Sequence, residues 1–149
     1  MKMAPENPPR YLGLDLGQRR IGLAVSDPLG LAAQPAGTVE RKNDRQAVEA
    51  VARVIDEYEV AVCVAGLPVN MDGTEGPQAR RARSFIGRLR KARPHAAYQM
   101  WDERLTSLAA DELLDSRRIK GPRRKALRDQ LAAMVILEEY LRHKKHDKR

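Results

Sequence analysis

Hydrophobic residues in the first forty positions follow the period-two pattern of β-strands. Tyr11–Gly17 and Arg20–Asp27 are short β-type runs with a close connection, which predicts a hairpin. Leu31–Glu40 is a weaker third strand, in which Pro35 indicates an edge position or a bulge. Further along, Val60–Leu67 is apolar throughout, as expected of a central strand that helices cover on both faces.

Apolar residues recur at helical spacing in later segments of the chain. The first predicted helix follows a capping residue, Asn43 or Asp44, and reaches about Tyr58. Further helices are expected over 78–91, from Thr106 or Ser107 to 115, and over 125–142. The last helix is expected to pack through Leu127, Leu131, Met134, Val135 and Leu137.

The remaining segments complete the order of elements. Residues 96–103 form another predicted strand, while 68–77 is a polar, glycine-rich and flexible loop. Residues 117–124 form a basic loop broken by glycine and proline. The order β-β-β-α-β-α-β-α-α predicts an α/β protein with a mixed sheet, in which ligands gather at the carboxyl ends of the parallel strands.

The composition of the 149-residue chain fits one globular domain, because 42% of the residues are hydrophobic and 32% are charged. No apolar run is long enough to span a membrane. The single cysteine, Cys63, excludes an intramolecular disulfide and favours a cytoplasmic protein. We expect a disordered tail at 1–10, the folded domain at 11–142 and a basic tail at 143–149.

The formal net charge of +8 is unevenly distributed, with −3 on residues 1–75 and +11 on residues 76–149. Clustered cations attract polyanions, so the second half predicts a nucleic-acid partner, although a solvated basic face that aids solubility is the alternative. Only six aromatic residues are present, which favours contacts with phosphates over stacking on bases. Besides the loop at 117–124, the candidate phosphate ligands are Arg80, Arg81, Arg83, Arg88, Arg90 and Arg93.

Asp15 is the first candidate catalytic residue. Alternation along its strand places it on the face opposite the three leucines, between Gly13 and Gly17. Two neighbours without side chains leave space for an anion and a metal to approach. The alternative is an aspartate that caps the following turn or pairs with Arg19 or Arg20.

Two further carboxylates lie in segments that could meet Asp15. Glu103 ends a strand and points away from Asp102, so only one of the two shares a face with Asp15; a salt bridge to Arg104 is the alternative role. Asp129 lies near the start of the last helix, where it could simply complement the helix dipole. Three carboxylates without a nearby histidine suit Mg²⁺ or Mn²⁺, and two such ions ~4 Å apart can clamp a phosphodiester.

Four ordered segments of the chain closely resemble the YqgF family of RuvX-like proteins. They are GLDLGQRRIGLAVSD (13–27), VAGLPVNMDGTEGPQARRARSF (64–85), WDERLTS (101–107) and KALRDQLAAMVIL (125–137). The resemblance extends from Tyr11 to Tyr140. It implies an RNase H-like fold, with a five-stranded mixed sheet in the order 3-2-1-4-5 and helices on both faces. Family members are described as pre-16S ribosomal RNA nucleases and as Holliday junction resolvases.

The resemblance also implies roles for individual residues. The acidic triad of the family falls on Asp15, Glu103 and Asp129, as catalytic residues and ligands of two Mg²⁺ or Mn²⁺ ions. Related resolvases use a fourth carboxylate one helical turn from the last, and this chain has none there. The residues expected to bind substrate are Arg20, Arg80, Arg81, Arg104 and Lys125.

The sequence therefore predicts a metal-dependent nuclease that acts on structured RNA or branched DNA, as a monomer or a homodimer. The alternative is a non-catalytic nucleic-acid-binding factor in ribosome assembly or recombination. An ATP-binding fold of the actin and sugar-kinase type is disfavoured, because such proteins need a second domain that 149 residues cannot supply.

Overall fold

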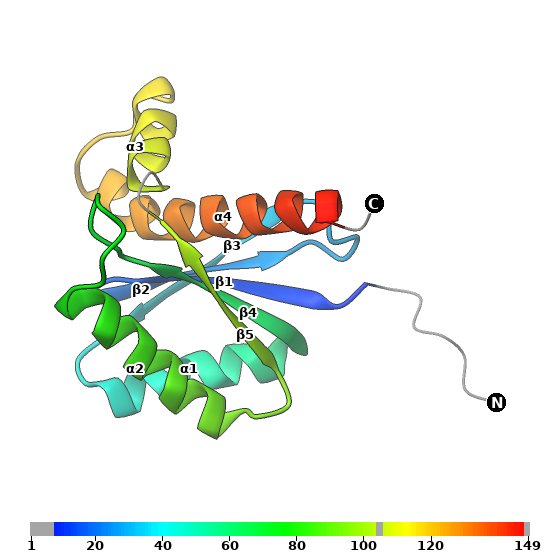
Figure 1. Cartoon of the computed structure of the whole chain (residues 1–149). Helices are drawn as coiled ribbons and strands as arrows, with labels where there is room; N and C mark the ends of the chain where they lie inside the picture. The colour runs from blue at the N-terminus through cyan, green and yellow to red at the C-terminus, as the bar shows by residue number, and fades with distance from the viewer. Residues whose placement is uncertain (1–7, 104–105, 148–149) are drawn as a thin grey trace.

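A five-stranded mixed sheet in the order β3-β2-β1-β4-β5 forms the centre of the protein (Figure 1). The computed structural model describes residues 8–103 and 106–147. The first three strands form an antiparallel meander, and β4 and β5 continue the sheet in parallel to β1. This topology confirms the predicted α/β sheet. The strands are β1 Arg10–Leu16, β2 Arg20–Ser26, β3 Ala33–Glu40, β4 Val60–Leu67 and β5 Ala97–Asp102.

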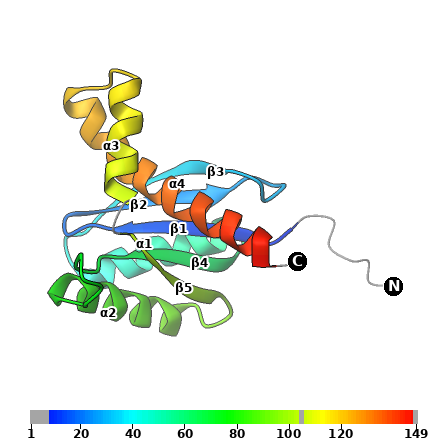
Figure 2. The ribbon, with the colours of Figure 1, turned by 45° about the horizontal axis from the view of Figure 1, so that its top comes forward.

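Helices cover both faces of the sheet, as predicted (Figures 1 and 2). Helices α1 (Asp44–Glu57) and α2 (Pro77–Ala92) lie on one face, and α4 (Gly121–Asp147) crosses the other. Helix α3 (Thr106–Ser116) packs mainly against the start of α4 and stands out beyond the sheet. Among the described residues, no helix is both long and apolar enough to cross a bilayer.

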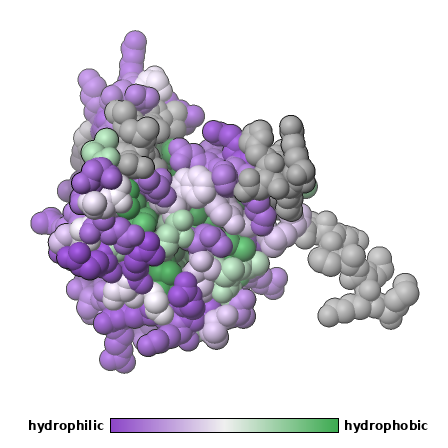
Figure 3. Space-filling model, in the orientation of Figure 1, coloured by the Kyte–Doolittle hydropathy of each residue, from purple (hydrophilic) through white to green (hydrophobic). Residues whose placement is uncertain are grey.

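The alternation of strand side chains divides the core into two layers. Leu12 and Leu14 of β1 face α1 and α2, where they pack with Ile55 and Phe85. On the other face, Val64 of β4 packs against α4 together with Ala133, Ile136 and Leu137. In the view of Figure 3 the surface is mainly hydrophilic, and hydrophobic residues show only in small areas near the middle of that face.

Helix α4 is longer at both ends than the pattern predicted, so its expected start and its expected end are both wrong. It begins at Gly121 rather than Lys125, because Pro122 fits the first turn of a helix, where no backbone N–H is needed. It continues to Asp147, through the stretch expected to be a basic tail at 143–149. The expected N-terminal tail also ends earlier, because β1 includes Arg10.

Contacts with β1 explain why α4 continues past Arg142. The ring of Tyr140 lies 6.0 Å from the ring of Tyr11, between centroids, and Lys144 Nζ donates to the Tyr11 hydroxyl oxygen at 2.5 Å. The predicted buried face of the helix is partly confirmed, since Leu137 is fully buried and Met134 packs against the same cluster. Leu127 and Leu131 are only partly buried, and the core also contains Ala132, Ala133 and Ile136.

The segment between β4 and α2 was expected to be a flexible loop and instead contains a hydrogen-bonded turn. Val69 and Glu75 form an isolated antiparallel bridge, and Asn70 N donates to Thr74 O at 2.8 Å. Asp72 Oδ1 accepts from Thr74 N at 2.9 Å.

The residue that caps α1 is Asn43 and not Asp44, because the Asn43 side chain accepts a hydrogen bond from Gln46 N.

Helix α4 approaches the sheet so closely that its backbone lies against a glycine of β2. A Cβ atom at Gly22 would overlap the carbonyl oxygen of Asp129. At Gly13 of β1, a Cβ would lie 2.7 Å from the carbonyl oxygen of Ala133. The helix can therefore hold this position only while these strand positions carry no side chain.

We predict that Gly22→Ala lowers the free energy of unfolding by about 2–3 kcal/mol, because the backbone of α4 must shift to admit one methyl group. Gly87→Ala in α2 is the matched control, since a Cβ there meets nothing within 4 Å. This control should stabilise the protein by up to about 1 kcal/mol through helix propensity. Urea unfolding of both variants measures the difference, and equal effects would refute the packing argument.

Candidate active site

Three carboxylates from distant parts of the sequence line one cavity of about 650 Å³. Asp15 is the second-to-last residue of β1, Glu103 directly follows β5, and Asp129 lies on α4. Because β1, β4 and β5 are parallel, their carboxyl ends lie at the same edge of the sheet. The structure thus brings together the three acidic residues that the sequence singled out.

The two glycines that flank Asp15 differ, and the expected space is not present beside both of them. The space beside Gly13 is filled by α4, whereas Gly17 lines the cavity, although a Cβ there would lie 2.5 Å from the carbonyl oxygen of Arg20. Asp15 lies on the α4 face of β1, because the leucines of this strand pack on the other face. The cavity lies at the carboxyl end of β1, where Asp15, Leu16 and Gly17 line it.

Glu103, and not Asp102, shares the α4 face with Asp15. Trp101 packs on that face against α4, and its indole Nε1 donates to Glu139 Oε2 at 3.1 Å. Two residues further, the Glu103 carboxylate lies over Gly66 of β4, where a Cβ would overlap its Oε2 atom. The absence of a side chain at Gly66 thus makes room for Glu103.

Asp129 is held by the arginine that begins β2. Arg20 Nε donates to Asp129 Oδ2 at 3.1 Å, and the two side chains are 28% and 15% exposed. Arg20 therefore pairs with Asp129 and not with Asp15, which was one of the alternative roles considered for Asp15. The helix-dipole role of Asp129 is also wrong, because α4 begins eight residues earlier and the dipole acts within the first turn.

Burial and mutual repulsion make the cavity a poor environment for negative charge. Burial raises the pKa of Asp15 to about 6, with a further contribution from the negative charge of Asp129, while Arg128 acts in the opposite direction. Burial likewise raises the pKa of Glu103 to about 7, helped by Asp15 and Asp102. These carboxylates therefore favour a bound proton or a cation.

The residues expected to bind substrate lie in different places. Arg81 lines the cavity from α2, whereas Arg80 and Lys125 are exposed and do not line it. Arg20 is engaged by Asp129. Arg104 lies outside the residues that the structure describes.

Two arginines of the cavity were missed by the sequence argument. Arg128 lines it beside Asp129, with its Nε donating to Asp111 Oδ1 at 3.1 Å, and its place in the motif next to Asp129 was the available signal. Arg41 follows β3 and donates from Nη1 to the carbonyl of Gly17 at 3.0 Å and from Nε to Asp44 at 2.9 Å. No local pattern marked Arg41, because its partners are distant in sequence or belong to the next helix.

The donor set of the cavity fits a hard divalent cation, although the side chains do not form a ready-made site. Among the described residues, no group of three His, Cys, Asp or Glu side chains could hold a metal ion as they stand. Carboxylate oxygens are the ligands that Mg²⁺ and Mn²⁺ prefer, and a cation would offset the repulsion that raises the pKa of Asp15 and Glu103. The chemistry of the residues therefore fits such an ion.

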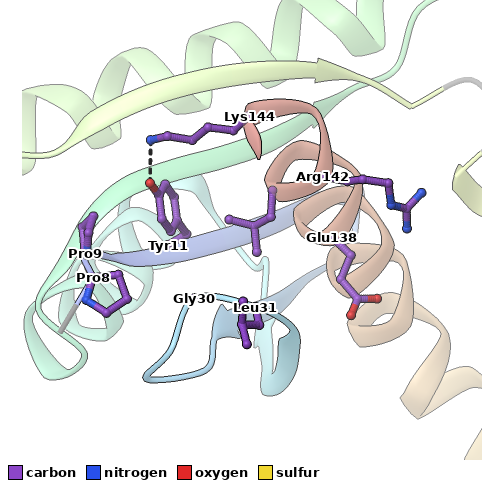
Figure 4. A pocket seen from close by; sticks show the side chains of 9 residues that line it. Pro8, Pro9, Tyr11, Gly30, Leu31, Glu138, Arg142 and Lys144 are labelled. Atoms are coloured by element: carbon purple, nitrogen blue, oxygen red, sulfur yellow. Dashed lines mark hydrogen bonds between the residues drawn. The ribbon is translucent and has the colours of Figure 1, made fainter. Parts of the chain in front are cut away.

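A second cavity, of about 450 Å³, lies at the opposite end of β1 (Figure 4). Pro8, Tyr11 and Leu31 line it from the strand side, and Glu138 and Lys144 from α4. The Lys144–Tyr11 hydrogen bond crosses one side of it. None of the residues expected to act on a substrate lines this second cavity.

The architecture is that of an RNase H-like domain, and solved structures share it. Thermus thermophilus RuvC, in a complex with a Holliday junction substrate, superposes with a TM-score of 0.63 at 16% identity, over 93% of this chain and 97% of that chain. Fowlpox virus resolvase, in a complex with Holliday junction DNA, superposes with a TM-score of 0.56 at 11% identity, over 91% and 98% of the two chains. Similarity at this level concerns the fold.

Sequence comparison identifies the family. The family model described as "RuvX: Holliday junction resolvase" matches residues 9–143. A Clostridium botulinum protein named "Putative pre-16S rRNA nuclease" is 43% identical over 132 residues, which cover 89% of this chain and 96% of the relative. A protein of the same name from Halothermothrix orenii is 40% identical over 134 residues, or 90% and 95% of the two chains. The chain belongs to the RuvX family, also called the YqgF family.

We predict that Asp15→Asn and Glu103→Gln each stabilise the cation-free protein at pH 8, by about 1–2 kcal/mol. Because folding raises both pKa values, the folded state binds more protons than the unfolded state between about pH 4 and pH 7, and wild-type stability falls as the pH rises through that window. Each amide variant loses the part of this dependence that its own carboxylate contributes. Urea unfolding in EDTA from pH 4 to pH 8 measures it, and a stability difference that does not change with pH would contradict the prediction.

Proposed function

We propose that the protein is a nuclease that hydrolyses phosphodiester bonds in structured nucleic acid, either precursor ribosomal RNA or branched DNA. The observation that carries the proposal is the convergence of Asp15, Glu103 and Asp129 on one cavity that Arg81 and Arg128 also line. Carboxylates beside arginines suit a reaction in which a polyanion must approach a cation. Membership of the RuvX family supports the same reaction class.

In this proposal, Asp15, Glu103 and Asp129 hold one or two Mg²⁺ or Mn²⁺ ions. Such an ion supplies an activated water and stabilises the departing oxygen. Asp15 is the central ligand, since its charge interacts with both of the other carboxylates. Arg41 fixes the connection that follows Asp15 through its bond to the carbonyl of Gly17, so it keeps the end of β1 in place.

Arginines on α2 differ in their freedom to bind phosphate. Arg83 makes two bonds of 2.7 Å to the carboxylate of Glu75, and Arg93 makes bonds of 2.7 and 2.6 Å to Asp56. In contrast, Arg80 and Arg81 make no ion pair with any other described residue. We therefore assign phosphate binding to Arg80 and Arg81, and a structural role to the two paired arginines.

The basic residues in and next to the connection between α3 and α4 likewise include one that is already paired and others that are exposed. Arg124 bonds to Asp115 at 2.6 Å and to Asp111 at 3.5 Å, so its charge is already balanced. The cations of this region that remain exposed are Arg117, Arg118, Lys120 and Arg123. Arg123 lies in the first turn of α4 and the other three directly precede this helix, whose first residue is about 12 Å along the helix axis from Asp129 at a rise of ~1.5 Å per residue. A nucleic acid bound at the cavity can reach these residues with a neighbouring phosphate.

A non-catalytic nucleic-acid-binding factor is the second candidate function. The observation in its favour is that Asp129 forms an ion pair with Arg20. Cleavage by the purified protein decides between the two functions.

We predict that Asp15→Asn and Glu103→Gln reduce cleavage at least 100-fold while nucleic-acid binding is retained, because each removes a carboxylate ligand. Asp102→Asn is the matched control, since this exposed neighbour of Glu103 lies on the other face of the strand, and its activity should stay within about threefold. The assay uses Mn²⁺ or Mg²⁺ with a labelled four-way junction, a duplex, single-stranded DNA and precursor 16S RNA.

The same panel separates the candidate functions. Cleavage that persists in Asp15→Asn would remove this residue from the mechanism. Binding without cleavage of any substrate by the wild type would favour the non-catalytic factor. Symmetric cleavage of a junction requires two active sites, so sedimentation in the presence of the junction shows whether a dimer forms.

We predict that the double variant Arg80→Ala and Arg81→Ala reduces the slope of log affinity against log salt concentration by about 2, since each lost phosphate contact removes about one unit. The double variant Arg83→Ala and Arg93→Ala has the same change in net charge and should leave the slope nearly unchanged. Fluorescence anisotropy with a labelled duplex between 50 and 300 mM salt measures both slopes. Equal slopes in the two variants would show that only overall charge matters.

A further inference from the structure

The ion pair between Arg20 and Asp129 joins the first residue of β2 to α4, the helix that brings Asp129 to the cavity. Arg20 begins β2 directly after the turn that follows Asp15, and Asp129 lies on α4, 109 residues later in the sequence. Both side chains are mostly buried, at 28% and 15% exposure, so solvent screens this pair less than a surface pair. The pair therefore needs an explanation beyond surface solubility.

This ion pair opposes the binding of a cation by Asp129. A guanidinium bonded to one carboxylate oxygen contributes a positive charge at the place where a divalent cation must approach. The negative charge of Asp129 raises the pKa of Asp15. The bond from Arg20 partly neutralises that charge and so weakens its effect on Asp15. Without Arg20, the negative charges of Asp15 and Asp129 would be less neutralised, and the affinity of these carboxylates for a cation would increase.

The guanidinium of Arg20 has further hydrogen-bond donors with which it can bind another anion. Its bond to Asp129 is made by Nε, and a guanidinium carries four further N–H donors on its two Nη atoms. A phosphate is a strong partner for this planar group. Arg128, the residue directly before Asp129 in the sequence, is itself held by Asp111 at 3.1 Å, so it does not replace Arg20 in the pair.

We propose that Arg20 pairs with Asp129 in the free protein and transfers to a substrate phosphate when nucleic acid binds, which releases Asp129 to bind a divalent cation. The inference rests on the proposed function, because it takes Asp129 as a cation ligand. Arg20 is then a positioning residue that couples two binding events. By thermodynamic linkage, each of the two ligands strengthens the binding of the other.

The experiment measures Mn²⁺ binding by isothermal titration calorimetry in the absence of nucleic acid. Arg20→Met should tighten Mn²⁺ binding about fivefold or more, because Asp129 no longer has a competing partner. Arg19→Met removes the same charge from the neighbouring exposed position and should change the affinity less than twofold. Arg20→Lys keeps a cation that can pair with Asp129, so its affinity should remain near that of the wild type.

A double-mutant cycle distinguishes release of Asp129 from simple charge repulsion. In an Asp129→Asn background, Arg20→Met should have no further effect on Mn²⁺ affinity, since no carboxylate remains to be released. If the fivefold gain persists in that background, repulsion alone explains it and the exchange is overturned.

A final arm tests the coupling with a duplex that carries phosphorothioate linkages, which keep the negative charge. Saturating duplex should tighten Mn²⁺ binding to the wild type about fivefold, after correction for Mn²⁺ bound by the duplex alone, and less than twofold to Arg20→Met. Equal gains would overturn the coupling. Mn²⁺ binding that Arg20→Met leaves unchanged refutes only the exchange, whereas the absence of Mn²⁺ binding in every variant refutes the cation site of the proposed function and the exchange with it.

Discussion

The close approach of α4 to the sheet is the constraint on which the cavity depends. The backbone of the helix lies against Gly22 and Gly13, and any side chain at these positions would push it outward. The backbone carbonyl of Asp129 is the group that contacts Gly22. The same contact therefore sets the distance between the carboxylates of Asp129 and Asp15. Gly66 has a related role, since it accommodates the carboxylate of Glu103. Three strand positions without side chains thus permit three acidic side chains to meet.

The carboxylates of the cavity repel one another, and neighbouring arginines partly offset this repulsion. Asp15 and Glu103 have raised pKa values because they are buried near other negative charges. Arg20 compensates Asp129, and Arg41 is held between Asp44 and the turn after Asp15. The arrangement keeps oxygen ligands close to arginines. A cavity of this kind suits the binding of a polyanion together with a cation.

The regular part of the structure follows from local patterns. Alternation in β1 correctly separated Asp15 from the leucines that face α1 and α2, and the apolar run at 60–67 correctly predicted a central strand. Predictions failed where an end of an element depends on distant contacts. Helix α4 continues beyond Arg142 because Tyr140 and Lys144 pack on Tyr11, at the other end of the chain.

The sequence by itself determined the types of element, the sheet order through family resemblance, and the identity of the three acidic residues. These properties depend on short periodic patterns and on motifs that are readable along the chain. Only the tertiary structure decided that Glu103 rather than Asp102 faces Asp15, that Arg20 pairs with Asp129 rather than with Asp15, and that α4 fills the space beside Gly13. The physical reason is that these contacts join segments far apart in the sequence, such as Arg20 and Asp129, which are separated by 109 positions, and the packing of a helix on a sheet sets their geometry.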